Sequence, residues 1–264
     1  MKFRPCIDLH AGKVKQIVGS TLTGTSTKDE SASPATNFST ERPASEFSKM
    51  YLRDELVGGH VIMLGKDEEN INAAKSALEA YPGGLQVGGG VNLDNCAGWL
   101  EAGASHVIVT SFVFKNGMIE YDNLKKLVNI VGKERLVLDL SCRKKVDEPD
   151  GPYYVVTDRW TRYSDVPVNE KTLNELAQYC DEFLVHGVEN EGKRCGILED
   201  LVVLLEKYSP VPCTYAGGVN SLQDLERVKV LGGGKIDLTI GSALDCFGGD
   251  IKYDEVVAWH KSEY

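Results

Sequence analysis

The chain has 264 residues, and its formal net charge is −10 because 39 Asp and Glu residues outnumber 29 Lys and Arg residues. This acidic balance excludes a broad basic face of the kind that binds nucleic acid. No run approaches 18 consecutive apolar residues, so we expect no membrane-spanning segment. The length fits a single α/β barrel, which takes about 250 residues.

Short apolar runs and helical patterns alternate along the chain. The apolar runs are rich in Val, Ile and Leu, which is typical of strands buried on both faces of a parallel sheet. We predict eight strands, at 3–9, 60–64, 85–88, 106–110, 135–140, 183–186, 211–215 and 236–240. A predicted helix follows each strand, at 44–57, 68–81, 93–102, 121–131, 169–181, 197–208, 221–231 and 251–260. This α/β pattern predicts a single (β/α)8 barrel, a TIM barrel, over residues 1–264.

An internal repeat supports the barrel. The motif Val-Gly-Gly-Gly-Val-Asn at 87–92 recurs as Tyr-Ala-Gly-Gly-Val-Asn at 215–220, and Ile-Asp-Leu at 7–9 recurs as Leu-Asp-Leu at 138–140. The copies lie roughly 130 residues apart, which is half of a barrel rather than the short period of a solenoid. The repeat therefore predicts two half-barrels, approximately 1–131 and 132–264.

Asp8 and Asp139 are the strongest catalytic candidates. Each ends an apolar strand, and strands one and five lie opposite one another in an eight-stranded barrel, so the two carboxylates are expected to face each other across its mouth. Two carboxylates whose surroundings separate their pKa values can act as general base and general acid. For either Asp alone, the alternative is that it caps its loop through backbone N–H groups.

Glycine-rich turns follow predicted strands three and seven, and a Ser ends the next strand in each case. The first set is Gly89, Gly90 and Ser111, and the second is Gly217, Gly218, Gly241 and Ser242. Glycines let backbone N–H groups approach a phosphate closely, and the loops after strands seven and eight are the usual phosphate site of such barrels. Two sites half a barrel apart predict a substrate with a phosphate at each end. A tight turn is the alternative for one glycine pair alone.

Two connections, 19–43 and 141–168, are too long for ordinary loops of a compact barrel and occupy equivalent places in the repeat. We expect both to act as lids, the first mobile without ligand and the second folded over the substrate. Trp160 in the second is predicted to stack on a planar heterocycle, with packing of the loop as the alternative. His186, at the end of strand six, is a candidate to hydrogen-bond the substrate or, alternatively, a core histidine.

Several motifs together are similar to the two-fold-repeat barrels of histidine biosynthesis. They are Pro-Cys-Ile-Asp-Leu-His-Ala-Gly-Lys-Val at 5–14, Gln-Val-Gly-Gly-Gly-Val at 86–91 and Tyr-Ala-Gly-Gly-Val at 215–219. The segments 137–144, 183–187 and 241–245 resemble the isomerase branch of that family in its eukaryotic form. The resemblance covers essentially the whole chain. It implies an Amadori rearrangement of an aminoaldose that carries a phosphoribosyl group at either end, without cofactor or metal.

The resemblance also implies roles for single residues. Asp8 would be the general base that takes the C2 proton of the sugar, and Asp139 the general acid that protonates the furanose ring oxygen and opens the ring. The two glycine-rich sites would hold the two phosphates. The chain departs from bacterial members at Gly187, where they carry a Thr, which makes Glu189 and Glu191 candidates to replace it.

Two other functions remain open at this point. The cyclase subunit of imidazole glycerol phosphate synthase is a sister barrel with two strand-end aspartates, but it needs ammonia from a glutaminase, for which we find no second domain. A non-catalytic phosphosugar sensor would need the phosphate sites but not both aspartates. We expect a monomer whose partner is the small bis-phosphorylated substrate, with no nucleic acid or membrane partner. We expect a soluble intracellular protein, of the cytoplasm or, after loss of a transit peptide, of the plastid stroma.

Overall fold

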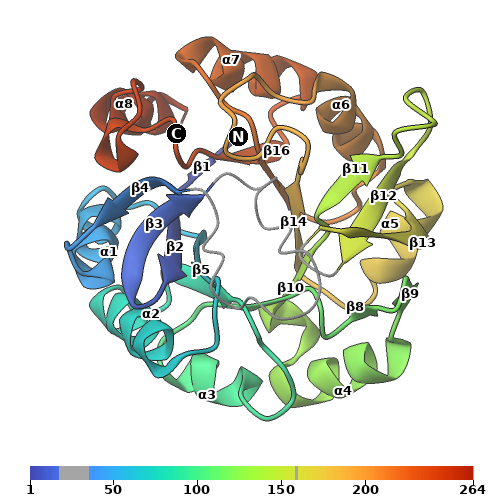
Figure 1. Ribbon diagram of the computed structural model, residues 1–264, viewed down its shortest axis with the longest axis horizontal. Coiled ribbons are helices and arrows are strands. Elements are labelled where there is room, and N and C mark those ends of the chain that lie inside the picture. The colour runs from blue at the N-terminus through green and yellow to red at the C-terminus, as the bar shows by residue number, and fades with distance from the viewer. Residues whose placement is uncertain (18–35, 158–159, 264) are drawn as a thin grey trace.

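The computed structural model describes residues 1–17, 36–157 and 160–263. In this part of the chain, a ring of parallel strands is surrounded by helices (Figure 1). The barrel strands are β1 (Phe3–Arg4), β2 (Cys6–His10), β5 (Gly59–Met63), β6 (Leu85–Gly88), β7 (Val107–Val109), β10 (Leu136–Asp139), β14 (Glu182–His186), β15 (Cys213–Ala216) and β16 (Ile236–Thr239). The α-helices are α1 (Ala44–Arg53), α2 (Glu68–Ala80), α3 (Cys96–Glu101), α4 (Tyr121–Val131), α5 (Glu170–Leu176), α6 (Glu199–Tyr208), α7 (Leu222–Leu231) and α8 (Tyr253–Ser262).

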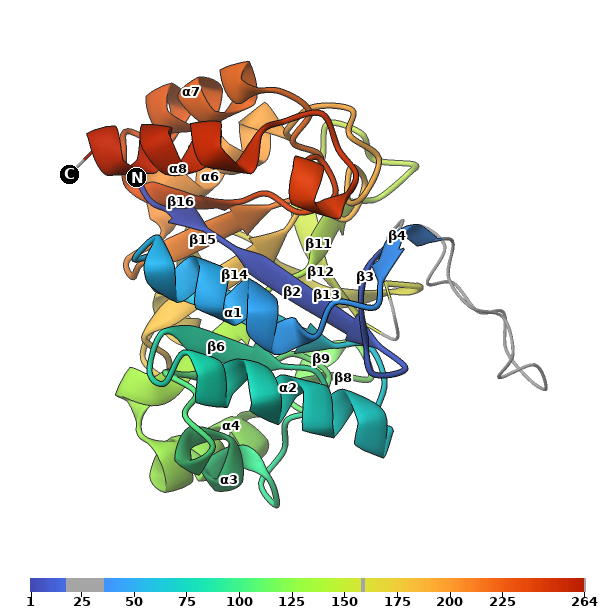
Figure 2. The same ribbon diagram turned by 90° about the vertical axis from the view of Figure 1, so that its left-hand side faces the viewer.

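The first strand closes the barrel in two pieces. Phe3 of β1 lies opposite Leu238 of β16, whereas Cys6 of β2 lies opposite His60 of β5, so the same extended segment joins both ends of the ring. Pro5 separates the two pieces because proline has no N–H to continue a ladder. Figure 2 shows this segment running obliquely across the side of the barrel. The fold class predicted from the sequence is therefore confirmed.

The predicted elements agree closely with the observed ones. The predicted strand 3–9 covers both β1 and β2, and each other predicted strand range overlaps one barrel strand. Each predicted helix range overlaps one of α1 to α8. The boundaries differ by a few residues, as at α3, which is shorter than its predicted range. The division into halves near residue 131 stays a prediction.

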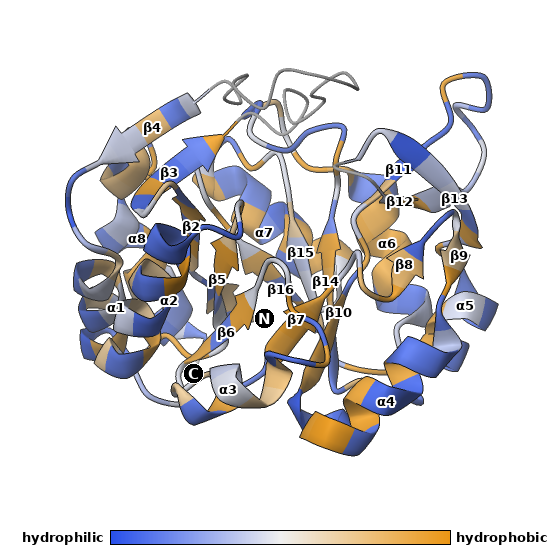
Figure 3. Ribbon diagram, turned by 60° about the horizontal axis from the view of Figure 1, so that its bottom comes forward, coloured by the Kyte–Doolittle hydropathy of each residue, from blue (hydrophilic) through white to orange (hydrophobic). Residues whose placement is uncertain are grey.

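The core has an outer layer and a small inner one. The outer layer lies between the strands and the helices, whose apolar faces turn toward the ring (Figure 3). The inner layer fills the barrel with Ile108, Val137, Leu184 and Ala216, against which Ile62 packs. This inner plug is small, so the barrel above it is open to polar side chains at the carboxyl ends of the strands.

Short antiparallel strand pairs, which were not predicted from the sequence, follow three of the barrel strands. After β2, the hairpin of β3 (Lys13–Ile17) and β4 (Thr36–Thr40) extends the barrel sheet, while the rest of the first predicted lid lies outside the described residues. After β10, a separate sheet is formed by β11 (Cys142–Lys144), β12 (Tyr153–Thr157) and β13 (Arg162–Pro167). A two-stranded hairpin, β8 (Phe114–Lys115) with β9 (Met118–Ile119), follows β7. No helix in the described part of the chain is long and apolar enough to cross a membrane.

Candidate active site

One pocket lies at the carboxyl ends of the barrel strands, and it brings together the predicted catalytic and substrate-binding residues. Its lining includes Asp8, Gly89, Gly90, Ser111, Asp139, Trp160, His186, Gly217, Gly218, Gly241 and Ser242. The roles of these residues in binding and catalysis stay predictions. Among the described residues, no three His, Cys, Asp or Glu side chains gather as metal ligands would.

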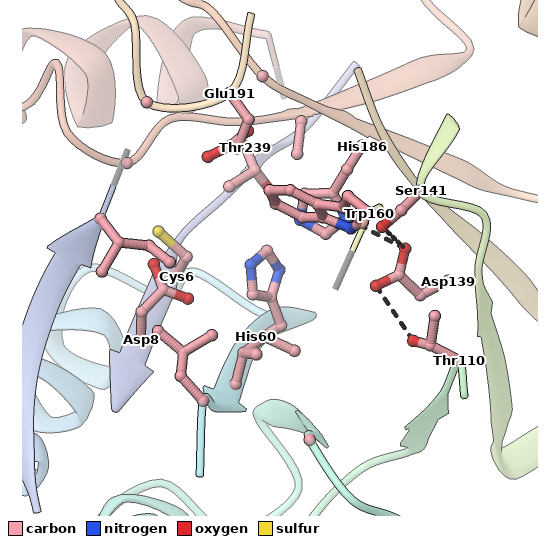
Figure 4. A pocket seen from close by; sticks show the side chains of 18 of the residues that line it. Cys6, Asp8, His60, Thr110, Asp139, Ser141, Trp160, His186, Glu191 and Thr239 are labelled. Atoms are coloured by element: carbon pink, nitrogen blue, oxygen red, sulfur yellow. Dashed lines mark hydrogen bonds and ion pairs between the residues drawn. The ribbon is translucent and has the colours of Figure 1, made fainter. Parts of the chain in front are cut away.

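Asp8 and Asp139 lie on opposite sides of this pocket, with the imidazole of His60 between them (Figure 4). Asp8 belongs to β2 and Asp139 ends β10, and three barrel strands separate β2 from β10 in either direction around the ring. The opposition expected from the repeat is thus present in the structure. A substrate lying across the mouth can meet one carboxylate from each side.

The surroundings of Asp8 favour its protonated form. Burial raises the pKa of its carboxyl to about 7, and the nearby charge of Glu191 adds to the rise. Gln16 of β3 opposes it by donating from Nε2 to Oδ2 of Asp8 at 2.8 Å. A carboxyl group with a pKa close to neutrality is well suited to take a proton from carbon and give it back.

The surroundings of Asp139 favour the opposite form. Burial alone would raise its pKa, but the charge of His186 and hydrogen bonds from His186 and Ser141 outweigh burial and lower the pKa. Oδ1 of Asp139 lies 3.1 Å from Nδ1 of His186 and 2.9 Å from the Ser141 hydroxyl, and Oδ2 accepts from the Thr110 hydroxyl at 3.3 Å. Asp139 is therefore an ionised carboxylate beside a charged imidazole.

This distribution of protons differs from the one expected from the sequence. The expected general acid, Asp139, is the more acidic of the pair, and the expected base, Asp8, retains its proton up to about pH 7. The two carboxyl groups do have separate pKa values, as acid–base catalysis requires. The order of those pKa values is set by burial and by contacts between residues of different elements, such as His186 with Asp139 and Gln16 with Asp8, which motif spacing does not reveal.

The glycine turns have the same backbone conformation in both halves. Gly89 and Gly90 have φ values of 94° and 75°, and Gly217 and Gly218 have 127° and 80°, in the left-handed region that favours glycine. A Cβ at Gly89 would clash with the carbonyl oxygen of Met63 at the end of β5. A Cβ at Gly217 would lie 2.8 Å from the carbonyl oxygen of Gly187, just after β14. The close backbone approach predicted for these turns is thus built into both halves.

Trp160 lies beside His186 at the rim of the pocket (Figure 4). Their ring centroids are 6.3 Å apart and the planes are tilted by 39°. Trp160 has a φ of 67°, which is uncommon for a bulky residue. Its stacking on a substrate heterocycle stays a prediction.

The structure explains Gly187 and separates its two proposed replacements. A Cβ at Gly187 would lie 2.8 Å from Cδ1 of Leu198 and 3.1 Å from the hydroxyl of Tyr215, so these side chains fill the space of a larger residue. Glu189 accepts a hydrogen bond from the backbone N–H of Lys144 at 3.1 Å and does not line the pocket. Glu191 does line the pocket.

Glu191 brings a third carboxyl group to the site. Its Oε2 is buried and has no hydrogen-bond partner in the described part of the chain. Burial raises its pKa, with a further contribution from Asp139. Motif reasoning had only named Glu191 as one of two candidates, and it had missed Gln16 and His60, which no local pattern distinguishes from ordinary strand residues. Burial lowers the pKa of His60 to about 3, so its imidazole is neutral.

Comparison with known proteins agrees with this geometry. The family model described as histidine biosynthesis protein matches residues 2–252. A chloroplastic protein of Medicago truncatula, HISN3, is 57% identical over 263 residues, which cover 100% of this chain and 83% of that protein. Proteins of Neurospora crassa and Saccharomyces cerevisiae are 46% and 44% identical, each over 99% of both chains. All three are named 1-(5-phosphoribosyl)-5-((5-phosphoribosylamino)methylideneamino) imidazole-4-carboxamide isomerase. This chain therefore belongs to the histidine biosynthesis protein family.

Proposed function

We propose that this chain is the isomerase for which its relatives are named and that it works through Asp8 and Asp139. The reaction converts an aminoaldose with two phosphoribosyl groups into the corresponding aminoketose by an Amadori rearrangement. The observation that carries the proposal is one pocket in which two strand-end carboxyl groups face each other between two glycine turns of the same conformation.

The two ends of the pocket suit the two ends of such a substrate. Each end of the pocket offers backbone N–H groups and a hydroxyl to phosphate oxygens. One end has a glycine turn with Ser111, and the other has a glycine turn with Gly241 and Ser242. Ser242 is buried whereas Ser111 is exposed, so the two phosphate sites differ in access to water. Binding at both ends would hold the reacting sugar between the carboxyl groups, which supplies the orientation that catalysis needs.

The chemistry follows from the protonation states. Asp8, with a pKa of about 7, is the general base that takes the proton from C2 of the opened sugar. We propose that the substrate binds with its ring oxygen, which must gain a proton for the ring to open, on the side of Asp139. Trp160 and His186 border the same space and are proposed to contact the heterocycle and the sugar. The residues supply acid, base and orientation, so we propose a reaction without cofactor or metal.

Incubation of the purified protein with the aminoaldose, in the absence of any ammonia source, tests the function. We expect formation of the aminoketose, which is separated from its precursor by chromatography. No product from the aminoaldose, together with ammonia-dependent loss of the carboxamide heterocycle from the aminoketose, would identify the cyclase instead. Thermal stabilisation by the aminoaldose without turnover would identify a sensor.

Assembly and compartment complete the proposal. We propose a monomer, because this chain by itself supplies both carboxyl groups and both expected phosphate sites, so the site needs no residue of a partner. The name of the Medicago truncatula protein places that relative in the chloroplast, and for this chain we propose the plastid stroma or the cytoplasm. Sedimentation of the purified protein and imaging of a fluorescent fusion test these two points.

A further inference from the structure

His186 occupies a position that a scheme with two aspartates leaves unused. Its Nδ1 lies 3.1 Å from Oδ1 of Asp139, so Nε2, across the ring, points away from that carboxylate. His186 lines the pocket, and no hydrogen bond within the described part of the chain involves Nε2. One ring nitrogen is therefore held by the protein, while the other is available to a ligand.

Asp139 is arranged to accept hydrogen bonds rather than to give a proton away. Ser141 and Thr110 direct hydroxyls at its two oxygens, at 2.9 Å and 3.3 Å, in addition to the contact with His186. An ionised carboxylate only accepts, so three such neighbours stabilise the ionised form. In His–Asp pairs of this kind the proton remains on the imidazole, and the aspartate fixes its orientation and its charge.

We propose that His186, rather than Asp139, delivers the proton to the ring oxygen of the sugar, an inference that rests on the proposed function. The bond between C1 and the ring oxygen breaks, and the oxygen keeps the electron pair and takes the proton from Nε2. The lone pair of the amino nitrogen forms a double bond to C1, and His186 is left neutral. Asp8 then moves the proton from C2 to C1, and the C2 hydroxyl returns its proton to His186 as the ketone forms. The enzyme gains and loses no proton overall.

The other groups that face His186 agree with a charged imidazole. Burial by itself lowers the pKa of the His186 imidazole. The negative charge and the hydrogen bond of Asp139 outweigh burial, and the charges of Glu191 and Asp8 act in the same direction, so the pKa of His186 is raised to about 9. The ring of His60 lies 6.2 Å away and is neutral at physiological pH, so it adds no opposing charge. At neutral pH, His186 therefore holds the proton that ring opening requires.

Titration of His186 tests the inference without substrate. The protein is labelled with 15N at histidine, and the resonance that disappears in His186→Asn is assigned to His186 and followed from pH 5 to 11. His106→Asn, which changes a histidine next to the amino end of β7, is the control for this assignment. We expect an imidazolium with a pKa near 9 and a lower pKa in Asp139→Asn. A His186 ring that is neutral at pH 7 would overturn the inference.

Kinetics at saturating substrate provide the second test. We expect His186→Asn to lower kcat by about 10²–10⁴-fold with little change in KM, and to abolish the alkaline decline of kcat. Because an altered residue in the pocket can disturb folding, His186→Gly is measured with added imidazole. Recovery of rate in proportion to the protonated imidazole supports a proton donor, which a packing role would not produce.

The outcomes separate this inference from the proposed function. Near-normal kcat in His186→Asn, or a folded His186→Gly protein that protonated imidazole does not rescue, would overturn the role of His186 and leave the isomerase activity in place. A wild-type protein that does not convert the aminoaldose at all would overturn the proposed function itself.

Discussion

Replacement of Asp8 by Asn is expected to stabilise the protein, and more strongly at alkaline than at acidic pH. The pKa of Asp8 is raised from 3.8 to about 7, mainly by burial. A group whose pKa is raised on folding contributes stability below its unfolded pKa, and this contribution is lost as the pH rises through its folded pKa. The native protein therefore carries an unfavourable buried charge above pH 7, and asparagine has the same shape without that charge.

The size of the effect follows from the shift. A rise from 3.8 to about 7 corresponds to at most about 4 kcal/mol of unfolding free energy. Asp8 is only partly buried, so screening by water reduces this to about 2 kcal/mol at pH 8 and below about 1 kcal/mol at pH 5. For a chain of this length, about 2 kcal/mol raises Tm by roughly 4–8 °C.

Melting curves of Asp8→Asn and wild type at pH 5, 6, 7 and 8 measure this effect, and Asp139→Asn is the matched control. Asp139→Asn should have a lower Tm than wild type, because it removes the charge that holds the buried imidazolium of His186. The loss of unfolding free energy should be about 1–3 kcal/mol. This is less than for a buried ion pair whose remaining partner must stay charged, because His186 can release its proton. Shifts of the same sign for both variants at pH 8, or an Asp8→Asn gain that does not grow with pH, would refute the reasoning.

Three further predictions concern activity. Asp8→Asn and Asp139→Asn should each lower kcat by about 10²–10⁴-fold while KM changes little, and either variant with a near-normal kcat would lose its assigned role. Gly218→Ala should raise KM more than Gly90→Ala does. The Cβ added at Gly218 meets the backbone carbonyl of Gly196, whereas the Cβ added at Gly90 meets only the flexible side chain of Lys66. If both variants kept the KM of the wild type, the predicted phosphate sites would be contradicted. Trp160→Ala should weaken binding of the whole substrate by about 1–3 kcal/mol, measured by calorimetry. It should weaken binding of a monophosphorylated fragment without the heterocycle much less. Equal losses of binding free energy for the two ligands would mean that the indole only packs its loop.

The barrel was predictable because its strands and helices are local patterns. Apolar runs such as 136–139 and helical stripes such as 222–231 are marked by composition and period alone. The hairpin of β3 and β4 was not predictable in the same way. The polar segment Thr36–Thr40 has no buried face, and its pairing with β3 depends on partners roughly 20 or more residues earlier in the chain. The sheet after β10 was likewise hidden within a connection of mixed composition.

The site was predictable in position but not in protonation. The repeat located both aspartates and both glycine turns at the ends of strands, and the barrel then brings strand ends together whatever the details of the loops. Gln16 and Glu191 reach the site from a hairpin and from a loop, where no period indicates their direction. Since a pKa depends on neighbours within a few ångströms, motif spacing could not decide which carboxyl group holds a proton.

The two halves differ at one position that accounts for the different states of the aspartates. Gly88 of β6 pairs with Ile62 of β5, and Ala216, the residue equivalent to Gly88 in the other half, pairs with His186 of β14. An imidazole thus stands in one half where the other half has an apolar side chain. The charged imidazole lowers the pKa of the adjacent Asp139, whereas Asp8, across the pocket, forms no ion pair with the described residues and keeps its proton to a higher pH. A repeat that would otherwise make two equal carboxyl groups therefore yields one carboxylate with a charged proton carrier and one base with a pKa near neutrality.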